Sequence, residues 1–437
     1  MATPNAPRNA LVVRRARSAV IALAFVLAPW AVDTQVLDIC GCGSIPNLPA
    51  FDSRNSATHP PGTVVSGTTV TLQVPEDGIF RFSSFSARNH IKFLRNARNS
   101  PVTILVAGDV TLDSTTGCCW TFDVRGEGGS TGTTNAAGIG GLGGPGAFRG
   151  GDGASRLIYG MSIGGAGFGG GGGQGGEEAT ACGGRGGQFF GALDLIPLAG
   201  GAGGGGGCSF SDTCSAGGGG GGGGGGLVIA ANGTITINDY QLLADGAGGG
   251  GPDNGACAAG GGGGSGGAIR LLANRLVHVN TANVFARPGG GGFQALAGSP
   301  GRVRLEAMDN SALNAFSTDP PAQRIVGPTP LADPIAPTVT VTSVGGSPVP
   351  AIPQGVFGSI DVVVPISGIT PIDVTTTGIP GGTTVQVTVK PRRGAHPVSE
   401  TVPLSGCTGA GGCQATATFN LAAGTYVVEA RATFQVQ

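Results

Sequence analysis

The stretch LVIAANGTITI at residues 227–237 is followed, 42 residues further on, by IRLLANRLVHV at residues 269–279. Both copies place apolar residues at alternate positions, which is the side-chain period of a β-strand. The offset continues to the end of each copy, and each copy is expected to form three short strands. If this offset is also the structural register, Ile229 stacks on Leu271, and Ile235 stacks on Val277, in one buried core.

Related patterns lie on both sides of these two copies. A third copy begins at Val102, a fourth begins at Val303 and stops early, and a less regular turn begins at Val70. One unit of three strands cannot bury its apolar face alone, whereas stacked units share a continuous core. The sequence therefore predicts an all-β fold that begins with a short right-handed parallel β-helix, from Thr68 to Ala307.

Three glycine tracts follow the third strand of their copies, at residues 126–226, 246–267 and 289–301, and should leave the β-helix at one corner. Ordering a glycine costs about 1 to 2 kcal/mol in backbone entropy and buries no side chain. Extended left-handed glycine helices have no internal hydrogen bonds, so their N–H and C=O groups can find partners only by lying side by side. We expect the tracts either to be mobile or to bond to one another.

The rung sequences DGIFRF at residues 77–82 and AGDVTL at residues 107–112, between glycine tracts, resemble those of exported bacterial glycine-rich proteins of the PE-PGRS-like group. The resemblance covers about residues 75–307. This chain lacks the Pro-Glu helical head of the mycobacterial members, so their host-directed roles do not transfer. The resemblance implies export and a β-helix fold, and no established activity.

Beyond the β-helix, six prolines between residues 320 and 337 indicate a linker. Alternating segments separated by turn residues then predict an immunoglobulin-like β-sandwich with strands at residues 339–341, 360–364, 372–375, 385–389, 415–419 and 426–434. The expected parts are a signal peptide at 1–32, an N-terminal segment at 33–67, the glycine-interrupted β-helix at 68–318, the linker at 319–337 and the sandwich at 338–437.

The first residues have the pattern of an export signal. Arg8, Arg14, Arg15 and Arg17 precede an apolar run at residues 19–28, and cleavage is expected near residues 31–33, with an uncleaved anchor as the alternative. We therefore expect an extracellular or cell-surface protein. Glycine and polar residues interrupt every later apolar run, so no further membrane span is predicted.

The charge of the chain is low. Charged residues make up 11 % of it, and loss of the four signal arginines would change the formal charge from -1 to -5. Such a chain has no electrostatic attraction for nucleic acid, so nucleic acid is not an expected partner. The oligomeric state stays open.

Ten cysteines in an exported chain favour disulfides over metal ligation. Cys407 and Cys413 share a spacing with Cys208 and Cys214, and both pairs are expected to be bonded. Cys40 and Cys42 have no second ligand pair nearby, so we expect them to form bridges elsewhere rather than a metal site. The pairing of Cys118, Cys119, Cys182 and Cys257 stays open.

Catalytic motifs are weak. Ser162 lies in a Gly-x-Ser-x-Gly pattern, but the same pattern recurs at Ser130 and Ser265, as chance predicts in a chain with 88 glycines. No helical periodicity surrounds any of the three, so Ser162 is not expected to be a nucleophile. No phosphate-binding loop or calcium repeat is present, and no cofactor or metal is expected.

Other polar candidates are scattered. His278 lies between Val277 and Val279, which would direct it outward, and His59, His90 and His396 occupy distant segments. A carbohydrate-active β-helix enzyme would need clustered carboxylates on one face of the solenoid. The sequence does not show that its carboxylates meet: Asp109, Asp113, Asp239 and Asp245.

These observations predict a structural or cell-surface protein without catalytic activity. The alternative is a binder of a neutral ordered surface such as polysaccharide or ice, because bundled glycine tracts would be flat and uncharged. A carbohydrate-active enzyme is the third possibility, by analogy of fold only.

Overall fold

The computed structural model describes most of the chain after Leu37. The described residues are 38–42, 45–114, 120–156, 162–177, 182–210, 214–253, 257–309, 311–329, 331, 337–353, 355, 357, 360–408 and 412–434. The expected signal peptide and the pair Cys118 and Cys119 lie outside them.

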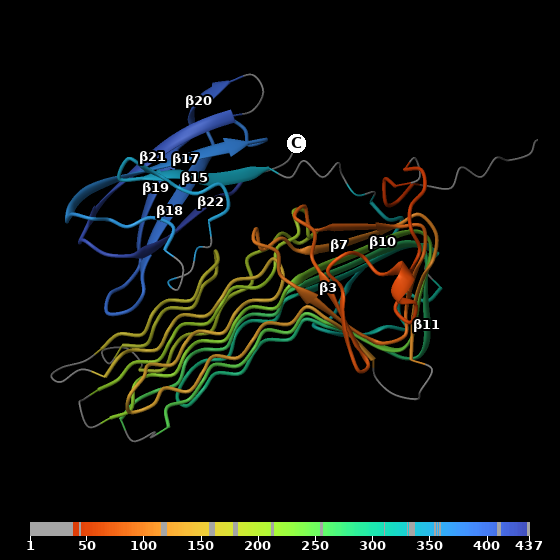
Figure 1. Cartoon of the computed structure of the whole chain (residues 1–437), viewed down its shortest axis with the longest axis horizontal. Helices are drawn as coiled ribbons and strands as arrows, with labels where there is room; N and C mark the ends of the chain where they lie inside the picture. Colours follow the sequence, from red (N-terminus) through yellow and green to blue (C-terminus); the bar gives the residue numbers. More distant parts are fainter. Residues whose placement is uncertain are drawn as a thin grey trace, which may run out of the picture. The chain divides into compact units, whose positions relative to one another are not determined.

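A curled sheet of 14 strands, mostly parallel, forms the first part (Figure 1). Its early strands are β1 (Phe51–Asp52), β2 (Val64–Ser66), β3 (Thr69–Gln73), β4 (Ile79–Phe82), β5 (Phe85–Ala87), β6 (His90–Leu94), β7 (Val102–Val106), β8 (Val110–Asp113) and β9 (Trp120–Asp123). Its later strands are β10 (Gly226–Leu243), β11 (Ala268–Phe285), β12 (Arg302–Asp309), β13 (Ser317–Asp319) and β14 (Gln323–Val326). The 3-10 turn η1 (Ser56–Thr58) follows β1.

The strands stack in successive turns of the chain. β4, β5 and β6 pair with β7, β8 and β9, and these three pair in turn with consecutive parts of the long strand β10. β10 pairs along its length with β11, and β11 with β12 and β13. The less regular turn does not begin at Val70 as expected. The strand there, β3, pairs with β6 and so belongs to the preceding turn.

The 42-residue register holds at both ends of the repeat but not in its middle. Ile229 pairs with Leu271 as predicted, whereas Ile235 pairs with Leu276, so the expected contact with Val277 is wrong. The first copy has two residues, Asn232 and Gly233, between its first two strands where the second copy has only Asn274. The middle strand is therefore displaced by one residue, which moves every side chain to the opposite face.

The displacement also corrects the orientation of His278. This residue pairs with the buried Ile237, and its ring lies edge-on to the buried Phe316 at 5.5 Å between ring centres. His278 therefore faces the inside of the sheet rather than solvent, and Val279 is the exposed residue.

Apolar side chains fill the inside of the curled sheet. One column consists of Ile104, Ile229, Leu271 and Leu305 in four consecutive strands, all fully buried. Each such side chain contributes about 1.5 to 3 kcal/mol on burial. The stacked copies thus share one core, as the repeat predicts.

The glycine tracts run out from the sheet as extended segments beside one another (Figure 1), and we call their described parts the glycine bundle. Residues 217–226 form its central segment. Successive N–H groups of this segment donate in rotation to the segments 124–130, 145–154 and 259–265, at N···O distances of 2.7–3.0 Å. The carbonyls of residues 217–224 accept in the same rotation from the segments 138–144, 201–207 and 247–250.

A three-residue rotation is the period of the polyproline II helix. None of the central glycines has a positive φ, which agrees with the left-handed form of that helix. Six neighbours therefore satisfy the backbone of the central segment, and each bond contributes a net ~0.5 to 1.5 kcal/mol against an entropy cost of similar size.

Glycine is required inside the bundle because the segments approach too closely for a side chain. A Cβ at Gly220 would lie 2.0 Å from the carbonyl oxygen of Gly204, and one at Gly153 would lie 1.9 Å from that of Gly217. The same carbonyl oxygens lie within reach of Cα–H···O contacts, which add a second, weaker set of attractions.

Disulfides cross the glycine bundle in a different pairing from the expected one. Cys182 is bonded to Cys208, and Cys214 is bonded to Cys257, so the predicted bridge between Cys208 and Cys214 is wrong. Each of these four cysteines is bonded to a cysteine of another segment of the bundle. The predicted bridge between Cys407 and Cys413 is present.

The C-terminal residues form two antiparallel sheets that share one hydrophobic cluster. The five-stranded sheet contains β15 (Thr338–Val344), β16 (Ser347–Pro348), β17 (Gly368–Thr377), β20 (Ser405–Thr408) and β21 (Gly412–Leu421). The three-stranded sheet contains β18 (Thr384–Pro391), β19 (Val398–Pro403) and β22 (Tyr426–Ala432). The expected strand at residues 360–364 is reduced to a single bridge between Val364 and Gly424.

A buried ion network joins β11, β12 and the segment after β14. The Glu306 carboxylate accepts from Arg270 Nε at 2.7 Å, from Arg304 Nε at 2.6 Å and from the Thr329 N–H at 2.9 Å. Burial alone would raise the pKa of Glu306, but these hydrogen bonds outweigh it and hold the pKa below its ordinary value. The ion network therefore requires the Glu306 carboxylate in its charged form.

We expect Glu306→Ala to lower the free energy of unfolding by about 3 to 5 kcal/mol, because it leaves two buried guanidinium groups without their partner. Glu76→Ala, at an exposed carboxylate, is the control and should change it by less than about 0.5 kcal/mol. Because the folded pKa of Glu306 is lowered, the wild-type advantage should be complete above the ordinary value of 4.5 and disappear as the pH falls through the folded pKa. Urea denaturation over this pH range measures both effects, and equal loss in the two variants would contradict the network's role.

No helix within the described residues is long and apolar enough to cross a membrane.

Candidate binding surface at the corner of the glycine bundle

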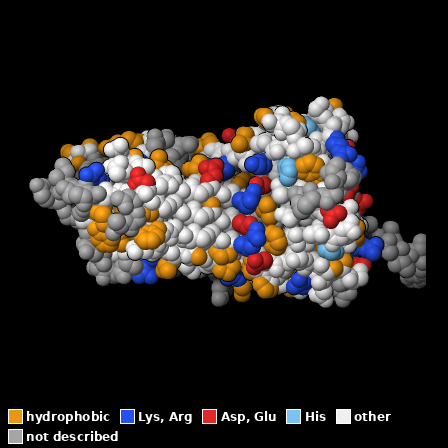
Figure 2. Space-filling model, turned by 90° about the horizontal axis from the view of Figure 1, so that it is seen from below, with side chains coloured by type: hydrophobic (Ala, Val, Ile, Leu, Met, Phe, Trp, Pro, Cys, Tyr) orange, Lys and Arg blue, Asp and Glu red, His pale blue; other side chains and the backbone are white. Residues whose placement is uncertain are grey.

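Charged side chains gather where the glycine tracts leave the sheet. Arg125 Nη2 lies 2.8 Å from Asp123 Oδ2, and Arg287 Nη2 lies 2.8 Å from Asp245 Oδ2. Figure 2 shows basic and acidic side chains alternating in a column at the junction with the glycine bundle. The corner at which a glycine tract leaves the sheet occurs once per turn. The repeat therefore places these charges side by side, next to neighbouring strands.

Hydrogen bonds within the two pairs stabilise the charged forms of Asp123, Arg125 and Arg287. Burial alone would raise the pKa of Asp123, but hydrogen bonds from Arg125 outweigh it and hold the pKa below its ordinary value. The hydrogen bond that Arg125 donates to Asp123 raises the pKa of Arg125, and the one that Arg287 donates to Asp245 raises the pKa of Arg287. Arg287 also lies over the ring of Phe285, at 4.2 Å from its centre. Asp123, Arg125 and Arg287 therefore stay charged at neutral pH.

A groove of about 840 Å³ runs along this column. We call it the corner groove. Its charged lining residues are three basic and three acidic ones, Lys92, Arg125, Arg287, Asp123, Glu127 and Asp245, so its formal charge is zero. The glycine bundle forms one wall through Gly248 and Gly290, and β3 and β6 form the other.

Three neighbouring positions of the bundle beside the groove carry no side chains. Gly128, Gly248 and Gly290 lie in neighbouring segments, which are joined by hydrogen bonds from Gly129 N to Gly248 O and from Gly249 N to Gly290 O. A Cβ at any of the three would meet no atom closer than 3.4 Å, in contrast to the glycines inside the bundle. Packing therefore does not require glycine at these exposed positions.

We call Gly128, Gly248 and Gly290 the glycine strip. Their backbone N–H groups are also available for hydrogen bonds to a ligand. Among the described residues, the N–H groups of Gly128, Gly248 and Gly290 donate no hydrogen bond. Figure 2 shows a broad area next to the charged column without hydrophobic or charged side chains. The corner groove and the glycine strip together offer hydrogen-bond donors and acceptors and have no net charge.

The sequence reveals only part of this site. The 42-residue offset aligns Asp245 with Arg287, but it does not group them with Lys92, Asp123, Arg125 and Glu127. The available signal was positional, because Arg125 and Arg287 stand at the same place just after the third strand of their turns. The glycine strip had no signal, since its members cannot be told from buried glycines in the sequence.

Ser162 lies inside the glycine bundle. It is buried, and its N–H donates to the Ser209 carbonyl at 3.1 Å. Within the described part of the chain, no histidine or carboxylate is hydrogen-bonded to its hydroxyl. A serine nucleophile needs such a base within reach.

The carboxylates considered as an enzyme site lie at three different corners of the turn. Asp109 accepts from the Thr234 N–H at 2.7 Å, and Asp113 accepts from Asn238 Nδ2 at 2.8 Å. Asp239 lies near Asp113 in the turn and accepts from the Thr281 N–H at 3.1 Å, whereas Asp245 lies in the corner groove. Each carboxylate joins neighbouring turns of the sheet.

Two of the remaining histidines contact the inside or edge of the sheet. The ring of His59 stacks on Phe51, and His90 lies within 2.9 Å of the Thr121 hydroxyl. Burial, followed by the charge of Lys92, lowers the pKa of His90. His396 lies between β18 and β19, far in sequence from His59 and His90. Among the described residues, no group of three side chains that could hold a metal ion includes a histidine.

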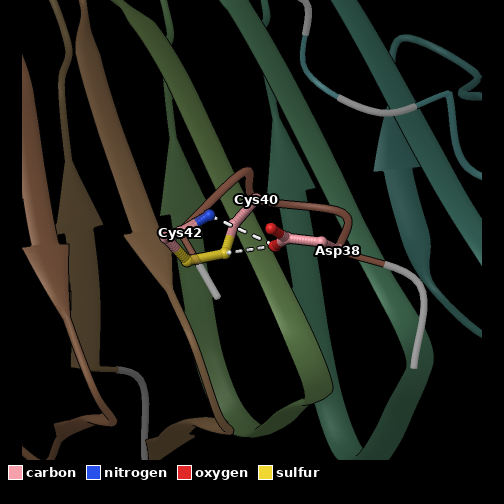
Figure 3. A group of neighbouring side chains, drawn as sticks. All are labelled: Asp38, Cys40 and Cys42. Atoms are coloured by element: carbon pink, nitrogen blue, oxygen red, sulfur yellow. Dashed lines mark hydrogen bonds between the residues drawn. A yellow bond between two sulfur atoms is a disulfide. The ribbon is translucent and has the colours of Figure 1, made fainter. Parts of the chain in front are cut away.

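Asp38, Cys40 and Cys42 form a compact group on the outside of the curled sheet (Figure 3). Their ligand atoms lie within 4.8 Å of one another, but the two sulfurs are bonded together, so neither is a thiolate ligand in this state. The expectation that these cysteines form bridges elsewhere is wrong, because a single intervening glycine with positive φ turns the chain back on itself. Asp38 is held by Asn232 Nδ2 at 2.8 Å.

Comparison of the chain with protein-family models finds no match, and comparisons with curated proteins and with solved structures find no significant one.

Proposed function

We propose that this chain is an exported structural protein of the cell surface or extracellular matrix, without catalytic activity. The observation that carries the proposal is the glycine bundle, in which six neighbours satisfy the backbone of one central segment. Such a bundle is rigid, carries few charged side chains and presents few reactive groups. It is suited to spacing or packing rather than to chemistry.

Disulfides support the exported location. The eight described cysteines form four bridges, and disulfides persist in oxidising compartments outside the cytoplasm. A cationic and apolar N-terminus supports the same location. The resemblance to exported PE-PGRS-like proteins also supports export of this chain.

Two finer assignments of fold belong to this proposal. The curled sheet would be a right-handed parallel β-helix, which the stacked registers of β7 to β12 support. The C-terminal sheets would be an immunoglobulin-like sandwich. Tyr426 supports this assignment, because its hydroxyl donates to the Ala422 carbonyl at 3.0 Å just before the last strand, as a tyrosine corner does.

Secretion and hydrolysis assays test the proposal. Expressed in a bacterial host with a C-terminal tag, the full chain should appear in the medium or on the protease-accessible surface, with no thiol that reacts before reduction. A reduced protein confined to the cytoplasm would overturn the exported role. Hydrolysis of short-chain esters that is lost in Ser162→Ala would overturn the non-catalytic one.

A further inference from the structure

We propose that the corner groove and the adjoining glycine strip bind an uncharged polysaccharide chain. This inference goes beyond the structural role and does not depend on it, because it concerns one defined surface of the folded chain. The surface consists of the six charged residues that line the groove, together with Gly248 and Gly290 on its wall and Gly128 beside them.

The charges of the groove select against charged ligands. Asp123 is paired with Arg125, and Asp245 is paired with Arg287, so no cluster of unpaired charge of one sign attracts a polyanion or a polycation. The same pairing leaves Asp123 and Asp245 already engaged by guanidinium groups. An uncharged ligand does not have to compete with the guanidinium groups for these carboxylates.

The groove nevertheless offers many hydrogen bonds. Arg125 and Arg287 have side chains that are 46 % and 45 % exposed, so their remaining N–H groups reach solvent. Glu127 adds an exposed acceptor, and Lys92 adds an exposed donor. Sugar hydroxyls both donate and accept, and hydrogen bonds to charged groups are roughly twice as strong as those between neutral groups.

The shape of the groove suits a chain rather than a single small molecule. It crosses β3, β6 and β9 and then the segments that directly follow β10 and β11, in the order of these strands in the sheet. With neighbouring strands about 4.8 Å apart, this is a length of roughly 19 Å. Leu94, which is 48 % exposed, and the exposed Pro288 provide apolar contacts for the C–H faces of sugar rings.

The glycine strip extends this surface. Its N–H groups have no acceptor among the described residues, and the absence of side chains lets a polymer approach the backbone directly. A flat strip alone would also suit ordered water in ice. The concave, charged groove beside it favours polysaccharide, because ice presents no chain that would fill a groove.

A steric block tests the site without disturbing the fold. Gly290→Trp adds a side chain in the wall of the groove, where a Cβ meets no atom within 4 Å. Gly251→Trp is the matched control, because a Cβ there also meets no atom within 4 Å and Gly251 does not line the groove. Circular dichroism and thermal unfolding of both variants should match the wild type.

Binding is measured by depletion of the secreted full chain from solution onto insoluble cellulose, chitin, β-1,3-glucan and starch. We expect retention on at least one of them, unchanged in 1 M NaCl, with an apparent affinity at least about tenfold weaker for Gly290→Trp and within twofold of wild type for Gly251→Trp.

Four outcomes would overturn the inference: no retention of a secreted, folded chain, elution by salt, equal weakening in both variants, or inhibition of ice recrystallisation without retention on any polysaccharide. The first outcome would leave the proposed structural role intact, whereas failure of secretion would contradict that role alone.

Discussion

Replacing Ile235 by Asp should abolish folding of the curled sheet. Ile235 is fully buried between Val110 and Leu276 in the stacked core, and an unpaired carboxylate there has no partner and no access to water. We expect a loss of more than about 4 kcal/mol, which is a large part of the stability of an ordinary domain. The measurement is urea unfolding followed by circular dichroism.

Thr236→Asp is the control for this variant. The side chain of Thr236 alternates with that of Ile235 and is only half-buried, so the substitution should cost about 1 kcal/mol or less. Comparable damage from the two substitutions would show that the assigned faces of β10 are wrong.

Replacing Gly220 by Ala should break the glycine bundle. The new Cβ would lie 2.0 Å from the Gly204 oxygen and 2.5 Å from its carbonyl carbon, and both atoms belong to backbone that is held by further hydrogen bonds. We expect a loss of about 3 kcal/mol or more, at the upper end of the usual cost of overpacking. Thermal unfolding by calorimetry would show the loss.

Gly251→Ala is the matched control, since its Cβ meets nothing within 4 Å and its φ is not left-handed. It should leave the unfolding temperature unchanged or slightly raised, because alanine lowers the entropy of the unfolded chain. If Gly220→Ala were as harmless as Gly251→Ala, the segments could not be packed as closely as the structure has them.

Most of the fold could be predicted from the repeat because apolar periodicity is a local signal. The strands of the two best copies and their stacking follow directly from it, as the contact of Ile229 with Leu271 shows. The slip at Ile235 could not be predicted, because a difference of one residue between Asn232-Gly233 and Asn274 does not change the overall offset. A compensating irregularity between Asn238 and Tyr240 restores it.

The glycine bundle could be predicted only as one of two alternatives. Entropy demands that ordered glycines satisfy their backbone groups, but every glycine looks alike, so the sequence does not reveal which segments become neighbours. For the same reason Cys208 is bonded to Cys182 rather than to the nearby Cys214. The corner groove depends on five adjacent strands, and its charges become visible as a group only after the register of those strands is known.

Amide hydrogen exchange of the central segment, residues 217–226, tests the account most directly. In oxidised protein labelled with 15N-glycine, these N–H groups should exchange slowly, as slowly as those of β10, because each donates to a neighbouring segment inside the bundle. The exposed Gly128, Gly248 and Gly290 should exchange rapidly in the same sample. Rapid exchange throughout residues 217–226 would show that the tracts are not bonded to one another, and would contradict both the glycine bundle and the binding surface built on it.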